Sequence, residues 1–176
     1  MKRKCLLTIL CCLISYISFS QILSDEENKL YTLLMAYRKE MGLPSIPLSK
    51  SLTKVAQTHV KDLQQNYIFQ DKCNMHSWSA KGKWTACCYT PNHSKATCMW
   101  NKPRELTSYK GNGYEIAFGI EGDEANAEEA LEGWKQSAPH NALIANTGLW
   151  NETWNAIGVG IFGGFAVVWF GNEVDK

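Results

Sequence analysis

Apolar side chains recur at helical spacing in two segments near the start of the chain. The first segment begins at Ser24, which forms the Ser-x-x-Glu pattern of a capping box with Glu27, and ends at Gly42. The second begins after Ser49, a good N-cap residue, and runs to about Asn66. This spacing predicts two consecutive amphipathic helices. The positions that share a face are Leu30, Leu33, Leu34, Tyr37 and Met41 in the first, and Leu52, Val55, Ala56, His59, Val60 and Leu63 in the second.

The second half of the chain has strand-like patterns around one further helix. That helix begins at Asn126, with Glu129 three residues later, and Pro139 is expected to end it. Branched residues alternate with glycine before Gly163-Gly164, which is a turn signal, and an almost wholly apolar segment follows. The expected strands are 114–118, 155–162 and 165–170, with the last one central. Helices that precede strands favour an α+β layered domain over a doubly wound sheet.

Residues 67–112 show no sustained period, and they contain every cysteine that follows residue 20. An even number of cysteines in a secreted chain predicts two disulfides. A bond between the neighbours Cys87 and Cys88 has awkward geometry. Each of them is therefore expected to pair with Cys73 or Cys98, which leaves two pairings open. The alternative is a closed zinc site made by the same cysteines with histidines from this segment, but the spacing fits no standard zinc module.

The first 20 residues have the features of a secretory signal peptide. Basic Lys2-Arg3-Lys4 precedes an apolar run, and Ser18-Phe19-Ser20 offers small residues for cleavage before Gln21. The alternative, an uncleaved anchor, is disfavoured because the run is shorter than the roughly 20 residues of a bilayer span. The expected organisation is a signal peptide at 1–20 and a single domain at 21–176, with no transmembrane span in the mature chain. Fifteen Lys and Arg against seventeen Asp and Glu then remain, so nucleic-acid binding is not expected.

Three separated segments carry candidate metal ligands. They are Met75-His76-Ser77, Gly113-Tyr114-Glu115-Ile116, and residues 134–141, which include His140. Imidazole nitrogens and carboxylate oxygens suit zinc-like cations. The separations fit no local helix motif, so the fold must assemble the site. Neutral imidazoles are expected to bind a cation above about pH 6.5 and to release it on protonation.

Together with Leu48-Ser49-Lys50-Ser51-Leu52 and Ile157-Gly158-Val159-Gly160, these segments resemble the CAP superfamily of cysteine-rich secretory, antigen 5 and pathogenesis-related proteins. The resemblance covers about residues 26–171 and is closer to the bacterial-type branch. It implies a three-layer α-β-α sandwich with a central, mainly antiparallel sheet. It also implies a groove lined by two histidines and acidic residues, which His76, His140 and Glu115 match. The fourth, acidic position of many members is Ser137 here.

The resemblance implies a secreted or extracellular protein, periplasmic or at the cell surface in a bacterium. Its expected role is a binding module that holds a divalent cation, with zinc as the expected metal, and takes a lipid, sterol, glycan or protein as a second ligand. The alternative is a metal-dependent peptidase or esterase in which Glu115 is the general base. A Ser137–His140–Glu115 triad is less favoured, because no nucleophile elbow surrounds the serine.

The remaining candidates are weighed against structural roles. Trp78, Trp84 and Trp100 are expected to offer a ligand-binding surface, because aromatic faces suit sugars and apolar ligands, with packing over the disulfides as the alternative. Ser137 has a structural role at a helix end as its alternative. The other expectations are Trp134 and Trp169 in the core, His59 as a satisfied, half-buried core histidine, His93 at the surface, and glycosylation sequons at Asn92 and Asn151.

Overall fold

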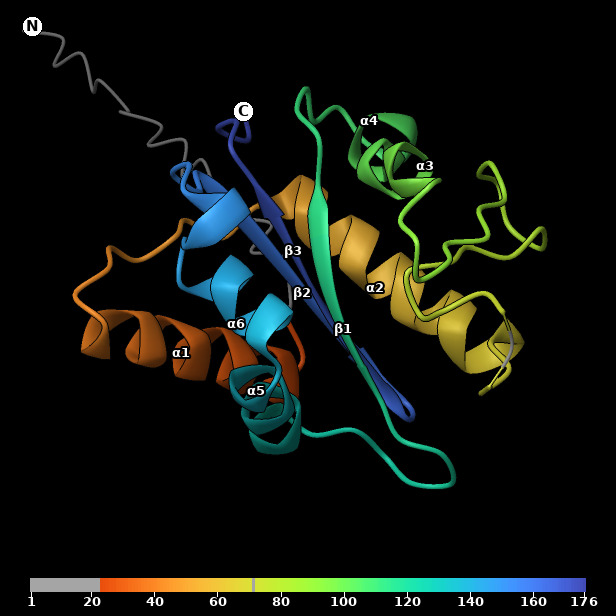
Figure 1. Cartoon of the computed structure of the whole chain (residues 1–176), viewed down its shortest axis with the longest axis horizontal. Helices are drawn as coiled ribbons and strands as arrows, with labels where there is room; N and C mark the ends of the chain where they lie inside the picture. Colours follow the sequence, from red (N-terminus) through yellow and green to blue (C-terminus); the bar gives the residue numbers. More distant parts are fainter. Residues whose placement is uncertain (1–22, 71) are drawn as a thin grey trace, which may run out of the picture.

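The computed structural model describes residues 23–70 and 72–176, so the expected signal peptide lies outside the described residues. Helices cover both faces of one antiparallel sheet (Figure 1). The elements in chain order are α1 (Asp25–Glu40), α2 (Lys50–Asn66), α3 (Ala96–Trp100), α4 (Lys102–Leu106), β1 (Tyr114–Gly119), α5 (Ala127–Gln136), α6 (Ala138–Ile144), the 3-10 turn η1 (Gly148–Trp150), β2 (Ala156–Phe162) and β3 (Phe165–Gly171). No helix in these described ranges is both long and apolar enough to cross a membrane.

The sheet has the strand order β1-β3-β2, and both pairings are antiparallel. Every residue of β3 is buried, as its nearly continuous apolar sequence requires of a central strand, so that prediction is confirmed. The hairpin between β2 and β3 turns at Gly163, whose φ of +54° favours glycine. The sheet is therefore a short antiparallel layer whose two faces are both covered.

Alternate side chains of the sheet enter two separate cores. Ile116, Val168 and Phe170 pack with α1, α5 and α6, whereas Val167 and Trp169 pack with α2 and the cysteine-rich segment. Figure 1 shows α1, α5 and α6 on one side of the sheet and α2, α3 and α4 on the other. This is the three-layer α-β-α sandwich that the sequence predicted.

Two glycines let α2 lie directly on β2. A Cβ atom at Gly158 would come within 2.1 Å of the Leu52 backbone carbon, and one at Gly160 within 2.6 Å of the Ala56 backbone carbon. The alternation of β2 follows from this packing, because Ile157 and its branched neighbours face the opposite core. Close contact between backbones fixes the position of α2, which carries a residue of the candidate site.

The outer edge of β2 is covered by the chain itself. The backbone N–H of Ser49 donates to Ile157 O at 2.7 Å, and the N–H of Ile157 donates to Pro47 O at 3.0 Å. Further along the edge, the N–H of Ile161 donates to Glu27 Oε1 at 3.3 Å. Glu27 comes from the first turn of α1 and is itself buried. The edge strand therefore has protein partners near both of its ends.

The predicted helix starts are confirmed in detail. The Glu27 N–H donates to Ser24 Oγ while the Ser24 N–H donates to the Glu27 carboxylate, which is a complete capping box. Ser49 caps α2 by accepting from Leu52 N at 2.9 Å. The expected end at Pro139 needs a correction: α5 ends at Gln136, and Pro139 lies in the first turn of α6. Proline is tolerated there because the first helical N–H groups have no partner within the helix.

The cysteine-rich segment is held by two disulfides, Cys73–Cys88 and Cys87–Cys98. Prediction of two disulfides without a vicinal bond is confirmed, and the structure selects one of the two open pairings. The alternative of a zinc site made by these cysteines is wrong, since all four thiols are oxidised. The segment also contains α3 and α4, two helices too short for a periodic pattern to reveal.

Candidate functional site

Two histidines meet on one buried carboxylate. His59 Nδ1 lies 2.5 Å from Glu115 Oε2, and His76 Nδ1 lies 2.9 Å from Glu115 Oε1. The side chains of His59 and Glu115 are fully buried, whereas the side chain of His76 is 18% exposed. The cluster therefore extends from the interior between α2 and the sheet to the protein surface.

Three elements bring this cluster together. Glu115 alternates with Ile116 along β1, so that its side chain enters the layer occupied by α2. His59 is on the buried face of α2. His76 comes from the segment after Cys73, where its N–H donates to Asn74 Oδ1 and where Asn74 N donates to Tyr89 O. The disulfide Cys73–Cys88 and these hydrogen bonds hold the histidine over the strand.

His59 is fixed through both of its ring nitrogens. Nε2 lies 2.9 Å from the carbonyl oxygen of Ser77, which can only accept, so Nε2 carries a proton. A hydrogen bond of 2.5 Å between Nδ1 and Glu115 requires a further proton on one of the two atoms. The imidazole also stacks on Trp78, with ring centroids 4.2 Å apart and planes within 5°. The ring therefore has almost no freedom to turn.

The charge on Glu115 is stabilised from both sides. Burial by itself raises the pKa of this carboxyl, but the charge and hydrogen bond of His59, and then those of His76, outweigh it and hold the pKa below its usual value. Each carboxylate oxygen has a histidine partner. Glu115 thus has the contacts of a residue that orients His76 through a hydrogen bond.

His140 lies beside His76 at the start of α6, with ring centroids 6.5 Å apart. Burial, and then the neighbouring His76, lower the pKa of His140 to about 4. His140 is therefore neutral throughout the physiological range. The expected release of a cation near pH 6.5 stays a prediction. Ser137 lies at the junction of α5 and α6, where it is the C-cap residue of the first helix and the N-cap residue of the next. Its backbone N–H donates to Trp134 O, and its side chain makes no capping hydrogen bond to α6.

The structure brings His76, Glu115 and His140 near one another, but Glu115 is already hydrogen-bonded to histidines. Among the residues that the structure describes, no three or more His, Cys, Asp or Glu side chains are grouped so as to hold a metal ion. Both oxygens of Glu115 contact histidines, His59 and His76. Within the described parts of the chain no hydrogen bond joins Glu115 to His140, so the contact that a Ser137–His140–Glu115 triad needs is not present there. Metal binding itself stays a prediction.

The three tryptophans that were expected to form a binding surface differ in their exposure. Trp78 is only 2% exposed and stacks on His59, so its assignment to a binding surface needs a correction: it is a core residue. Trp84 and Trp100 are partly buried and keep some surface. Trp134 and Trp169 are in the core, as predicted. The sequon residues Asn92 and Asn151 and the surface candidate His93 are all exposed.

The sequence pattern alone does not reveal the part of His59 in this site. It was expected to be a satisfied core histidine, and it is satisfied, but it is fully buried and its partner is the candidate-site carboxylate. The available signal was a pair of anomalies: a histidine on the apolar face of one helix and a carboxylate in a short apolar strand. A buried ionisable group requires a partner, so each anomaly accounts for the other.

Comparisons with known proteins agree with this architecture. The model of the cysteine-rich secretory protein family matches residues 31–164. An extracellular protein containing an SCP domain from Bacillus anthracis has a TM-score of 0.56 at 18% identity, over 84% of this chain and 40% of that one. A cysteine-rich secretory protein from Staphylococcus aureus gives 0.54 at 12% identity, over 84% of this chain and 38% of that one.

A third solved structure is similar over nearly its whole length. An outer surface protein from Borrelia burgdorferi has a TM-score of 0.57 at 18% identity, over 86% of this chain and 96% of that one. The present chain therefore spans well under half of the first two proteins and almost all of the third. At these identities the similarity shows the fold alone. No curated protein matches the chain.

Proposed function

The chain belongs to the cysteine-rich secretory protein family, and from this premise we propose that it is a secreted, extracellular binding protein that holds a divalent cation between His76 and His140. The family assignment and the extracellular or outer-surface nature of similar proteins support the location. The chemistry of the two histidines supports the cation. A lipid, sterol, glycan or protein is then the second ligand of the groove.

The observation that carries the proposal is the orientation of His76. Its Nδ1 is engaged by Glu115, a residue that is itself held by His59. The other ring nitrogen, Nε2, is then the one that could coordinate a cation. Histidine ligands of metals typically have their second nitrogen on a carboxylate, which fixes the ring and makes it more basic. Glu115 is therefore proposed to orient a ligand rather than to be one.

His140 has the protonation state that a ligand needs. With a pKa of about 4, its imidazole keeps an unprotonated nitrogen at neutral pH. Two imidazoles on one tetrahedral zinc have ring centres roughly 5–6 Å apart, given Zn–N bonds of about 2.1 Å. The two ring centroids are 6.5 Å apart, which is close to this separation and supports the proposal that both could bind one cation. When bound, zinc would supply a Lewis-acidic centre with coordination positions open to a ligand.

The hydrolase alternative receives no support from the position of Glu115. A general base must reach the proton that it removes. The Glu115 side chain has 0% exposure, and histidines contact both of its oxygens. This arrangement favours a binding module over an enzyme that uses Glu115 as its base.

Calorimetric titration of the mature domain with zinc at neutral pH tests the proposal. We expect binding by the wild type and its loss in the His76→Ala/His140→Ala double variant. The matched control is His93→Ala, which removes an exposed histidine of the same cysteine-rich segment and should leave the affinity unchanged. Glu115→Gln should weaken zinc binding by roughly 10–100-fold, the effect typical of losing a carboxylate that orients a metal ligand.

Two outcomes would overturn the proposal. Equal zinc affinity in the wild type and the double-histidine variant would show that any zinc binds at another site. Absence of zinc binding by a folded wild type would show that the domain does not bind this cation. Circular dichroism and thermal unfolding of each variant separate these outcomes from loss of structure.

A further inference from the structure

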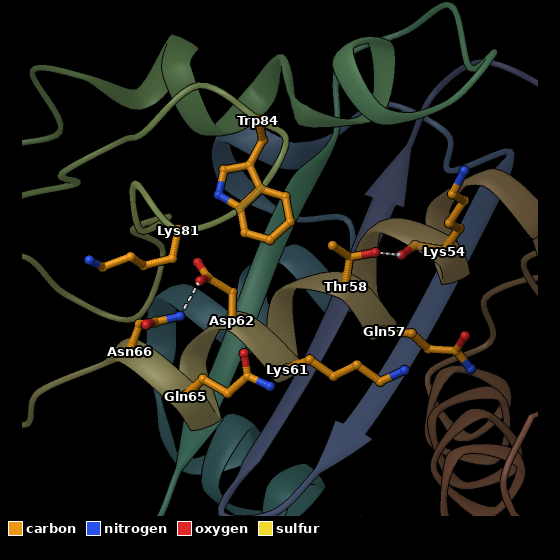
Figure 2. A pocket seen from close by; sticks show the side chains of 9 residues that line it. All are labelled: Lys54, Gln57, Thr58, Lys61, Asp62, Gln65, Asn66, Lys81 and Trp84. Atoms are coloured by element: carbon orange, nitrogen blue, oxygen red, sulfur yellow. Dashed lines mark hydrogen bonds between the residues drawn. The ribbon is translucent and has the colours of Figure 1, made fainter.

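A polar pocket of about 460 Å³ lies on the outer side of α2, away from the sheet. One wall is the exposed surface of the helix and the other is the loop that carries Lys81 and Trp84 (Figure 2). None of its lining residues belongs to the His59–Glu115–His76 cluster. The volume is within the range of pockets that hold small organic ligands.

Three lysines line this pocket: Lys54 and Lys61 on α2, and Lys81 on the facing loop. All three are exposed. No salt bridge within the described parts of the chain joins any of them to an acidic side chain. In Figure 2, Lys81 lies on one side of Trp84 and the other two lie on the opposite side. The pocket therefore presents separated positive charges around an aromatic side chain.

The Trp84 indole is held in a fixed position. Its Nε1 donates to Ser79 O at 2.9 Å, and its ring meets the Trp78 ring edge to face at 5.2 Å. The six-membered ring also lies against Gly82, where an added Cβ would be only 2.0 Å from the indole. Glycine is thus required at this position for the indole to lie where it does. Trp84 is a fixed aromatic surface that projects into the pocket (Figure 2).

The acidic residue of the pocket does not cancel these charges at the surface. Asp62 is 4% exposed, and its carboxylate accepts from Ser79 N at 2.8 Å, Ser79 Oγ at 2.5 Å and Asn66 Nδ2 at 2.8 Å. Its hydrogen bonds anchor the loop to α2. The groups left for a ligand are the lysines, the indole and the carboxamide of Gln65. The amide of Gln57, by contrast, donates to Glu27 Oε2 at 2.9 Å.

From this combination we propose that the pocket binds an acidic glycan, a saccharide carrying sulfate or carboxylate groups. A sugar ring presents an apolar face suited to an indole and hydroxyls suited to carboxamides. The lysines pair with its anionic substituents. Lys54 and Lys61 are seven residues apart in α2, about 10 Å along the helix axis, which is too far apart to enclose one small anion. Nucleic acid is disfavoured, because single strands are bound by aromatic side chains that stack on successive bases, and the lining of this pocket includes one aromatic residue, Trp84.

Calorimetry with a heparin-derived tetrasaccharide as the probe tests this inference, with neutral chitotetraose, inorganic sulfate and a short oligothymidylate as comparisons. The wild type should bind the sulfated probe at least about tenfold more tightly than each of the others. Replacing Lys54, Lys61 and Lys81 together by Gln should weaken that binding by roughly tenfold or more. Trp84→Ala should weaken binding of both saccharides, and Trp84→Phe should restore part of it.

The matched control replaces three exposed lysines outside the pocket, Lys39, Lys95 and Lys110, by Gln. It makes the same change in net charge and should leave binding within about twofold, because charges beyond a Debye length are largely screened. Equal losses in the two triple variants would overturn the proposal as non-specific attraction. So would equal binding of inorganic sulfate, which means a plain anion site, or of oligothymidylate, which means a nucleic-acid site. A folded wild type that does not bind the sulfated probe would also overturn it.

This pocket and the proposed cation site at His76 and His140 can be tested separately. The His76→Ala/His140→Ala variant should bind the sulfated probe as the wild type does. The triple lysine variant should bind zinc unchanged. Failure of either proposal therefore leaves the other intact.

Discussion

The two faces of the sheet are built in different ways. Toward α1, α5 and α6 the strands present branched and aromatic side chains such as Ile116, Val159 and Phe170, all fully buried. Toward α2 they present apolar side chains such as Val167 and Trp169, and also two glycines of β2 and the carboxylate of Glu115. Both faces are covered by an apolar core, but only the α2 face adds close backbone contact and the cluster of two histidines on a buried carboxylate.

This difference shows how a small domain makes room for a polar site. Glycines bring α2 close to the sheet, so His59 on that helix can reach Glu115 on β1. The third member, His76, is on a segment with little regular structure, which two disulfides stabilise in place of a larger core. The α2 face therefore adds crosslinks and close backbone contacts to its apolar core.

The largest expected effect is from a single methyl group on the α2 side. Gly158→Ala should cost at least about 4 kcal/mol of stability, because its Cβ meets the backbone of α2 and neither backbone can move away cheaply. The control is Gly133→Ala in α5, whose Cβ meets only the Phe118 side chain at 3.3 Å; its stability should change by less than about 1 kcal/mol. Urea unfolding measures both. Similar small effects would show that α2 does not lie so close to β2.

The next effect comes from the buried carboxylate. Glu115→Leu should cost about 3–5 kcal/mol, since it leaves two histidines without their partner in a buried site. Glu115→Gln should cost less than half of that, because its amide can donate to His59 while its oxygen accepts from His76. Chemical denaturation at neutral pH measures the difference. If the two variants are equally unstable, charge rather than hydrogen bonding holds the cluster together.

A third experiment asks whether the two faces unfold separately. The Cys73→Ala/Cys88→Ala variant opens a crosslink between residues 15 positions apart, which should cost ~3 kcal/mol. Hydrogen exchange should increase around His76 and Tyr89 more than in α1 and α5. Uniform loss of protection over both faces would indicate that the domain unfolds only as a whole.

The smallest expected effect concerns the start of α2. Asp175 accepts from Ser49 Oγ at 2.7 Å and from Ser51 N at 2.8 Å. Burial alone raises the pKa of Asp175, but these hydrogen bonds outweigh it and hold the pKa below 3.8. Asp175→Asn should cost about 1 kcal/mol at neutral pH. A lowered pKa stabilises the fold above pH 3.8 and loses that contribution as the pH falls below it, so the two proteins should converge in acid. Urea unfolding of both proteins between pH 2 and pH 7 measures the difference in stability. A difference that stays the same at every pH would contradict this prediction.

Most of the fold could be predicted because its signals are local. The capping residues Ser24 and Ser49, the turn at Gly163 and the apolar β3 each act over a few neighbouring residues. The failures have physical reasons too. Pro139 is compatible with either a helix end or a helix start, and the chain uses it for a start. Periodicity cannot detect α3 and α4, which have five residues each.

The candidate site was only partly predictable, because its contacts join distant segments. The residue types and the resemblance indicated His76, Glu115 and His140, and the structure brings them near one another. Their division of roles depends on His59, whose partner is 56 positions away. Burial of Trp78 was equally inaccessible, since it follows from stacking on that same histidine. The sequence pattern does not show which side chains from distant segments contact one another.

The covered edge of β2 has a consequence for the behaviour of this protein at high concentration. An open edge strand offers unpaired N–H and C=O groups to any other extended chain and so promotes aggregation. Here the segment before α2 and the carboxylate of Glu27 occupy those groups. The contacts that position α1 and α2 thus also hinder the addition of another chain to the sheet at the β2 edge.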